Sequence, residues 1–127
     1  MSGGVWERMA AYINNGHANL QTYGKSVVEG IGKYKDIYEQ GATDTQELNY
    51  GKAANKYGDA IYETSNGYSD SSASWHKDYV NFTNNSYPFF FRGGRDTYTT
   101  NAGTFSFGRT TGENSIYDGF RLTIPII

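Results

Sequence analysis

The C-terminal third of the chain alternates between apolar and polar positions. Three aromatic residues, Phe89–Phe91, form one short run, and both Thr104–Gly108 and Gly119–Ile124 alternate large apolar residues with small or polar ones. A period of two residues is typical of strands that bury one face. The pattern therefore predicts three strands, joined by polar loops at Asp96–Asn101 and Arg109–Asp118.

The same alternation predicts which side chains form the core. Alternation lets at most two of the three consecutive phenylalanines share a face, so we expect one ring, Phe91, near an exposed surface. Aliphatic residues are sparse, so aromatic rings must supply much of the core. The expected core residues are Trp6, Phe105, Phe107, Phe120, Leu122 and Ile124.

Patterns in the first two thirds of the chain are weaker. Val5–Met9 fits either a short strand or a helix that continues through Ile13, whereas Asn14–Gly24 has the composition of a loop. Gly30 and Gly32 count against a helix beyond Val27, and Lys33–Tyr38 alternates like a short strand. Further along we expect a turn at 41–45 and a helix from Asp44 or Thr45 to Tyr57. A short apolar segment at 60–64 and a loop at 65–74 should follow. We then expect one or two helical turns at 75–82, packed on the core, and a turn at 84–86.

Composition narrows the functional classes. The chain has 127 residues, a net charge of −2 and no basic stripe, so nothing favours binding to nucleic acid. It has no apolar segment long enough to span a membrane. Because it has no cysteine, thiol catalysis, disulfides and thiolate metal sites are excluded.

Candidate catalytic or metal-binding residues are few. The two histidines are His17 and His76, and no nucleophile, base and orienting group share a motif. Four aspartates (Asp70, Asp78, Asp96 and Asp118) could supply oxygen ligands to calcium, but their spacing matches no known calcium loop. We therefore expect no cofactor and no catalytic residue, with calcium as the one open alternative.

Three short motifs, taken in order along the chain, resemble those of the formylglycine-generating-enzyme (sulfatase-modifying-factor) superfamily. They are Gly4-Val5-Trp6-Glu7, Arg92-Gly93-Gly94 and Gly119-Phe120-Arg121-Leu122. The resemblance implies a C-type-lectin-type fold and favours a strand at Val5–Glu7. The expected fold class is thus α+β: a C-type-lectin-like domain with a small, twisted antiparallel sheet, short helices and extensive loops. We expect one domain over residues 1–127, excised from a longer protein.

The departures from the superfamily indicate a non-catalytic branch. Its oxidases use cysteines, which this chain lacks, and its Ser-Trp after Arg-Gly-Gly is Arg95-Asp96 here. Without the catalytic cysteines, the chain resembles ligand-binding proteins of phages and bacterial surfaces, including the variable proteins of diversity-generating retroelements. In these the diversified segment lies between the second and third motifs. Every residue of Asp96–Asn101 can arise from an asparagine codon by changing adenines, although any exposed loop favours the same residue types.

The sequence therefore predicts a non-enzymatic ligand- or receptor-binding module at a cell surface, outside the cell or on a virion, with a protein or glycan as its target and oligomer formation possible. Tyrosine with serine, threonine and asparagine is typical of binding surfaces. The alternatives are a structural virion or fibre-tip domain, whose loops would lie between subunits, and a degenerate enzyme. We expect Arg92 and Arg121 to be structural. The expected ligand-binding residues are Phe91, Arg95, Asp96, Thr97, Tyr98, Thr99, Thr100, Ser106, Arg109, Thr110, Thr111, Ser115, Tyr117 and Asp118.

Overall fold

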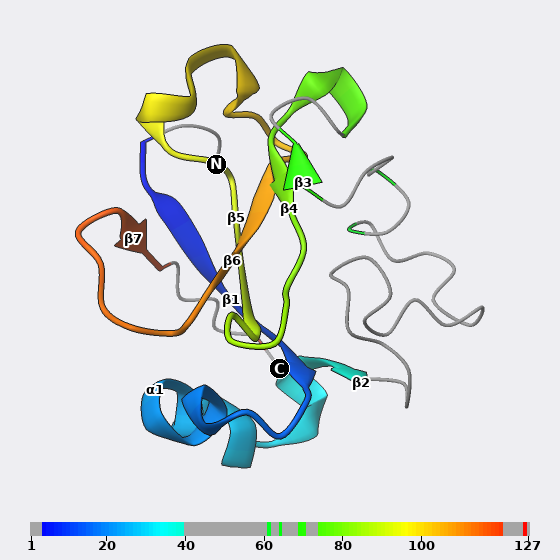
Figure 1. Ribbon diagram of the computed structural model, residues 1–127, viewed down its shortest axis with the longest axis vertical. Coiled ribbons are helices and arrows are strands. Elements are labelled where there is room, and N and C mark those ends of the chain that lie inside the picture. The colour runs from blue at the N-terminus through cyan, green and yellow to red at the C-terminus, as the bar shows by residue number, and fades with distance from the viewer. Residues whose placement is uncertain are drawn as a thin grey trace.

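The computed structural model describes residues 4–39, 61, 64, 69–70, 74–120 and 126, and it has the α+β class expected from the sequence. The elements are β1 (Trp6–Asn14), α1 (Ala18–Glu29), η1 (Gly32–Tyr34), β2 (Asp36–Glu39), β3 (Ser69–Asp70), η3 (Trp75–Lys77), β4 (Val80–Asn81), β5 (Phe89–Arg92), η4 (Asp96–Asn101), β6 (Phe107–Thr110) and β7 (Asp118–Gly119). Helix α1 lies at one end of a twisted sheet, and the 3₁₀ turns η3 and η4 lie at the other (Figure 1).

The sheet is mixed, so the expectation of an antiparallel sheet was wrong. Its strands follow the order β2-β1-β5-β6-β4-β3, and β7 also pairs with β1. The pairs β1–β5, β5–β6 and β3–β4 are antiparallel, whereas β1–β2, β1–β7 and β4–β6 are parallel. A helical crossover lets a chain return parallel to the strand it left, and α1 provides that connection between β1 and β2.

Several predicted elements are confirmed. Trp6 and Glu7 of the first motif begin strand β1, one residue later than predicted, and the run of three phenylalanines forms most of β5. The turn at 84–86 is closed by backbone hydrogen bonds between Asn84 and Tyr87. The alternating segment before residue 39 ends in strand β2.

The segment predicted as a loop from Asn14 to Gly24 instead contains most of helix α1. His17 caps this helix, because its Nδ1 accepts a hydrogen bond from the backbone N–H of Asn19 at 3.1 Å. Gly24 interrupts the helical backbone, and a Cβ atom at this position would lie 2.1 Å from the ring of Phe89. A histidine cap and an internal glycine are both unusual helix signals, which explains the error.

The strand predicted at Thr104–Gly108 begins later, at Phe107. Residues 104–105 form a turn, in which the Ser106 N–H donates to the carbonyl of Gly103 at 3.0 Å. Ser106 is only 1% exposed, and its hydroxyl donates to the carbonyl of Tyr79 at 2.9 Å. Phe105 is consequently half-buried, with its ring against Trp75.

Two other predictions at the core are also corrected. Phe120 is 83% exposed, since β7 ends one residue before it. The helical turns predicted at 75–82 reduce to η3, and Trp75 is exposed there, although Phe82 is buried. Leu122, Ile124, Arg121, the turn at 41–45 and the helix predicted from 44 to 57 lie outside the described residues, as does most of 60–74.

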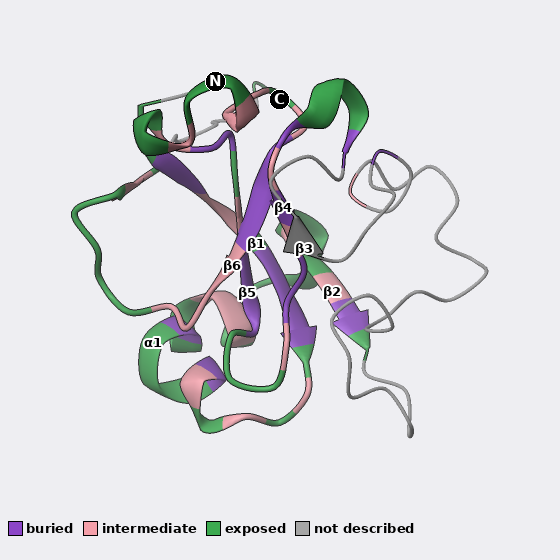
Figure 2. Ribbon diagram, turned by 45° about the horizontal axis from the view of Figure 1, so that its top comes forward, coloured by how far each residue is buried: buried purple, intermediate pink, exposed green. Residues whose placement is uncertain are grey.

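The sheet buries apolar side chains on both faces. One cluster contains Ile13, Tyr38, Val80, Phe82, Phe90 and Phe107, among others, and a second contains Tyr12, Leu20 and Phe89 beneath α1. Two successive residues of β5, Phe89 and Phe90, thus pack in different clusters, because side chains alternate between the two faces of a sheet. Figure 2 shows buried residues along β1, β5 and β6, and exposed residues along η4 and the chain leading to β7. The predicted burial of Trp6 and Phe107 is confirmed.

Candidate functional site

A glycine corner places the exposed segment that follows β5. Gly93 and Gly94 have φ angles of 87° and 66°, which favour glycine. The Gly93 N–H donates to the carbonyl of Ser106 at 2.9 Å, and a Cβ atom on Gly94 would lie 2.9 Å from the Cα of Ala102. The corner therefore fixes where η4 begins relative to β6.

Backbone hydrogen bonds tie η4 to the rest of the fold. The Asp96 N–H donates to the carbonyl of Gly4 at 3.0 Å, and the Tyr79 N–H donates to the carbonyl of Asn101 at 2.8 Å. Within η4, Thr99 has φ 49° and ψ −117°, a conformation that branched side chains rarely adopt. Such strain persists only where the surroundings impose it, and it is found most often at functional sites.

Tyr98 of η4 packs on a cluster of aromatic rings. The ring of Tyr98 stacks on Tyr79 with centroids 4.5 Å apart and lies edge-on to Trp6 at 5.6 Å. Trp6 in turn packs on Phe91 at 4.2 Å. Burial, followed by the nearby Tyr98 hydroxyl, raises the pKa of Tyr79, whose hydroxyl accepts a hydrogen bond from Asn81 Nδ2 at 3.0 Å. Tyr98 is therefore anchored on one side and half-exposed on the other.

Arg95 brings Tyr98 together with the loop before β7. The carbon of its guanidinium group lies 5.2 Å from the ring centre of Tyr98 and 4.4 Å from that of Tyr117. Both distances fall within the range of cation–π contacts. Tyr117 is 44% exposed, so this contact joins two loops on the surface.

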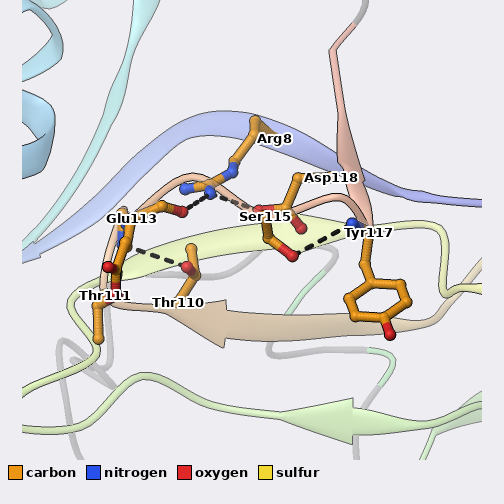
Figure 3. A network of polar contacts seen from close by, with 8 residues as sticks. Arg8, Thr110, Thr111, Glu113, Ser115, Tyr117 and Asp118 are labelled. Carbon is orange, nitrogen blue, oxygen red and sulfur yellow. Dashed lines mark hydrogen bonds and ion pairs between the residues drawn. The ribbon is translucent and has the colours of Figure 1, made fainter.

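Arg8 holds the second loop in place (Figure 3). Its Nη2 atom pairs with the carboxylate of Asp118 and donates to the carbonyl of Glu113. The Ser115 hydroxyl accepts from the N–H of Tyr117 at 3.2 Å. Figure 3 shows the ring of Tyr117 pointing away from Arg8, and that ring is the one that contacts Arg95.

The structure brings some of the predicted ligand-binding residues together. Arg95, η4, Tyr117 and its neighbours Ser115 and Asp118 form one surface, which we call the η4 surface (residues 95–100 and 115–118). Phe91 lies under it, half-buried beneath Trp6.

Other predicted residues do not join the η4 surface. Ser106 is buried, and it therefore cannot belong to an exposed site. Strand β6 pairs Phe107 with Arg92 next to the glycine corner, whereas it pairs Thr110 with Phe89 near α1. Arg109, Thr110 and Thr111 thus lie toward the opposite end of the sheet, where Arg109 Nη1 donates to the carbonyl of Phe82 at 3.2 Å.

Sequence reasoning missed the supporting residues Arg8 and Tyr79. Arg8 directly follows the first motif, and a charged residue within the strand expected there was a usable signal. Arg92, predicted to be structural, donates to Glu7 at 3.0 Å between paired strands.

Three of the four candidate calcium ligands have protein partners. The buried carboxylate of Asp78 accepts from the N–H of Phe105 at 2.9 Å, and Asp96 accepts from the N–H of Thr97 at 2.9 Å. Asp118 pairs with Arg8, and the side chain of Asp70 is not described. Across the described ranges, no three His, Asp or Glu side chains gather as metal ligands.

A groove of about 430 Å³ lies on the other side of the Arg8–Asp118 pair, between α1 and the loop before β7. Its lining is largely apolar and includes Met9, Val27, Phe89 and Phe120. No residue of η4 lines it, but Ser115 and Asp118 of the η4 surface do, so the groove and that surface share one edge. No helix in the described part of the chain is long and apolar enough to cross a membrane.

Comparison of the chain with protein-family models, with curated proteins and with solved structures finds no match. The geometry of the η4 surface is therefore the basis for assigning a function.

Proposed function

We propose that this protein is a non-enzymatic binding module that recognises a protein or glycan on a target cell through the η4 surface. The observation that carries the proposal is the contact of Arg95 with the rings of Tyr98 and Tyr117, which joins two exposed loops into one surface. Arginine and tyrosine are enriched among the residues that contribute most to binding energy. We further propose a C-type-lectin-like scaffold that acts at a cell surface or on a virion.

The support beneath the surface favours binding. The glycine corner, the backbone bond to Gly4 and the Arg8–Asp118 pair hold both loops before a ligand arrives. A preorganised surface loses less conformational entropy on binding. Threonine hydroxyls and tyrosine rings then offer hydrogen bonds and large contact areas at low entropic cost.

We also propose that η4 is a diversified segment. Each of its residues can arise from an asparagine codon by changing adenines, and η4 lies between the second and third motifs. A reverse-transcriptase gene and a near-copy of the 3′ coding segment beside the source gene would support this idea. Their absence from the gene neighbourhood would remove it.

Binding can be tested on a glycan array and on arrayed bacterial surface extracts. The fluorescent domain should bind at least one of them saturably, and a Tyr98→Ser/Tyr117→Ser variant should bind at least tenfold more weakly. Tyr87→Ser is a matched control, because Tyr87 is also exposed and also packs against an arginine, Arg109, but outside the η4 surface. Equal binding by the double variant would contradict the proposal.

A structural role in an oligomer is the second candidate. It is favoured by two exposed apolar side chains close to Tyr117 in the chain, since Ile116 is 86% and Phe120 is 83% exposed. Sedimentation of the domain distinguishes the two functions. A stable trimer that loses its subunit contacts on Ile116→Ser would favour the structural role over ligand binding.

A further inference from the structure

Arg95 differs from the other described arginines in how it is held, since Arg109 donates to the carbonyl of Phe82 and the others pair with carboxylates. Arg8, Arg92 and Lys25 each pair with a carboxylate, and Lys35 donates to two carbonyls at the end of α1. Within the part of the chain that the structure describes, Arg95 pairs with no carboxylate, and its contacts are to the two tyrosine rings.

The Nε atom of Arg95 is buried and has no hydrogen-bond partner among the described residues. Because this atom is buried, a ligand can reach the guanidinium group only at its outer nitrogens. The rings contact the guanidinium group, which holds its orientation while its outer N–H groups stay available. A planar guanidinium fixed in this way matches the two oxygens of a carboxylate.

The acidic residues of the η4 surface do not take this role. Asp118 is neutralised by Arg8, and the carboxylate of Asp96 accepts from the N–H of Thr97. The positive charge of Arg95 therefore has no paired counter-charge within the η4 surface.

We propose that Arg95 is the recognition site for a carboxylate side chain of a protein partner. This inference rests on the proposed function, because it assigns a ligand class to the same surface. The ligand carboxylate would accept hydrogen bonds from the outer guanidinium nitrogens, while Tyr98 and Tyr117 would contact the residues beside it.

The residues around Arg95 favour a protein over a saccharide. Ile116, which directly precedes Tyr117 in the chain, is 86% exposed, and the rings of Tyr98 and Tyr117 contact the guanidinium group. Aromatic and apolar side chains around an arginine are typical of the centre of protein–protein interfaces, where other charged residues are depleted. A free sugar would leave these apolar groups in water.

The inference can be tested by NMR of the arginine Nε–H signals of the intact domain. Two capped pentapeptides serve as probes, acetyl-Gly-Leu-Glu-Tyr-Gly-amide and its glutamine counterpart, with N-acetylneuraminic acid as a carboxylate of saccharide origin. The Arg95 signal is identified by its loss in Arg95→Gln. Lys77→Gln is the control for general charge, since Lys77 is exposed and its carbonyl accepts a hydrogen bond from Asn101 of η4.

We expect the glutamate peptide to shift the Arg95 signal and to bind at least tenfold more tightly than the glutamine peptide. That preference should fall below twofold in Arg95→Gln and persist in Lys77→Gln. The inference is overturned if both peptides bind equally, if the saccharide binds more tightly, or if no probe gives a saturable shift up to about 10 mM. A loss of array binding in the Tyr98→Ser/Tyr117→Ser variant would still stand in those cases, so the two proposals fail separately.

Discussion

The two ends of the β5–β6 strand pair are stabilised by different kinds of contact. At the α1 end, the ring of Phe89 fills the space next to two glycines: Cβ atoms on Gly24 and Gly112 would lie 2.1 and 2.8 Å from it. At the opposite end, beyond the pairing of Arg92 with Phe107, the rings of Tyr79 and Tyr98 stack on each other, and Tyr98 lies edge-on to Trp6.

The two ends should therefore differ in how well they tolerate substitutions. The α1 end is packed so closely that an added methyl group must displace a ring, whereas the η4 end presents threonines, tyrosines and Arg95 on a supported surface. Close packing makes a core sensitive to small changes in volume, while exposed side chains can vary at little cost. The η4 end is therefore the end at which a binding surface can change without loss of the fold.

Removing the ring of Phe89 should have the largest effect. Phe89→Ala leaves a cavity between the sheet and α1 and should lower the free energy of unfolding by about 3–5 kcal/mol, measured by urea denaturation. Phe120→Ala is the control and should change stability by no more than about 0.5 kcal/mol, because Phe120 is exposed. Similar losses in the two variants would show that the α1 end is not the packed end.

Gly24→Ala should have the next largest effect. Its methyl group would overlap the ring of Phe89, and such overpacking costs about 1–3 kcal/mol. Adding Phe89→Leu should reduce the cost of Gly24→Ala, which a double-mutant cycle measures directly. Gly32→Ala is a matched control with nothing within 4 Å of its new atom. A Gly24→Ala protein as stable as the wild type would mean that the ring moves aside freely.

The sequence predicted the strands around Phe89–Arg92 and the glycine corner because local periodicity and glycine chemistry determine them. It could not predict α1, whose cap is a histidine and whose interior glycine is explained only by the ring of Phe89, which lies far along the chain. Phe120 was misplaced for a related reason, since the alternation continues past Gly119 while the β7 pairing ends there.

The candidate site was predicted in part. Residues 95–100 were found because a polar run between two motifs is visible locally, and Tyr117 because it lies in the second polar run. The contact that unites them depends on Arg8 and on the register of β7 with β1, which no local pattern encodes. Register likewise decided that Arg109–Thr111 lie toward the α1 end.

Relieving backbone strain at the η4 end should give a smaller effect of opposite sign. Thr99→Gly should raise the free energy of unfolding by about 1 kcal/mol, because glycine adopts the φ and ψ of this position without steric strain. Thr97→Gly, at an ordinary backbone position in η4, should lower it by about 0.5–1 kcal/mol. Thermal melts of both variants decide the matter, and a loss of stability in Thr99→Gly would show that its side chain supports the fold.

The smallest expected effect is a pH dependence at the η4 end, and it arises from Tyr79. Burial, with the adjacent Tyr98 hydroxyl, raises the pKa of Tyr79 above its ordinary value of 10.0. The neutral phenol is thus favoured in the folded state. Below pH 10.0 both states keep the proton, and the contribution of Tyr79 to stability is fully present. As the pH rises further, the unfolded chain loses the proton first, so stability falls until the pH passes the raised pKa of the folded state.

Tyr79→Phe isolates this contribution. At neutral pH the variant should be less stable by about 0.5–1.5 kcal/mol, because it loses the hydrogen bond from Asn81 Nδ2. Since phenylalanine has no proton to release, the stability of the wild type should fall relative to that of the variant as the pH rises above 10.0, which urea denaturation at stepped pH would reveal. Parallel curves for the two proteins above pH 10.0 would mean that the Tyr79 hydroxyl is solvated. Water would then reach the aromatic residues that support η4.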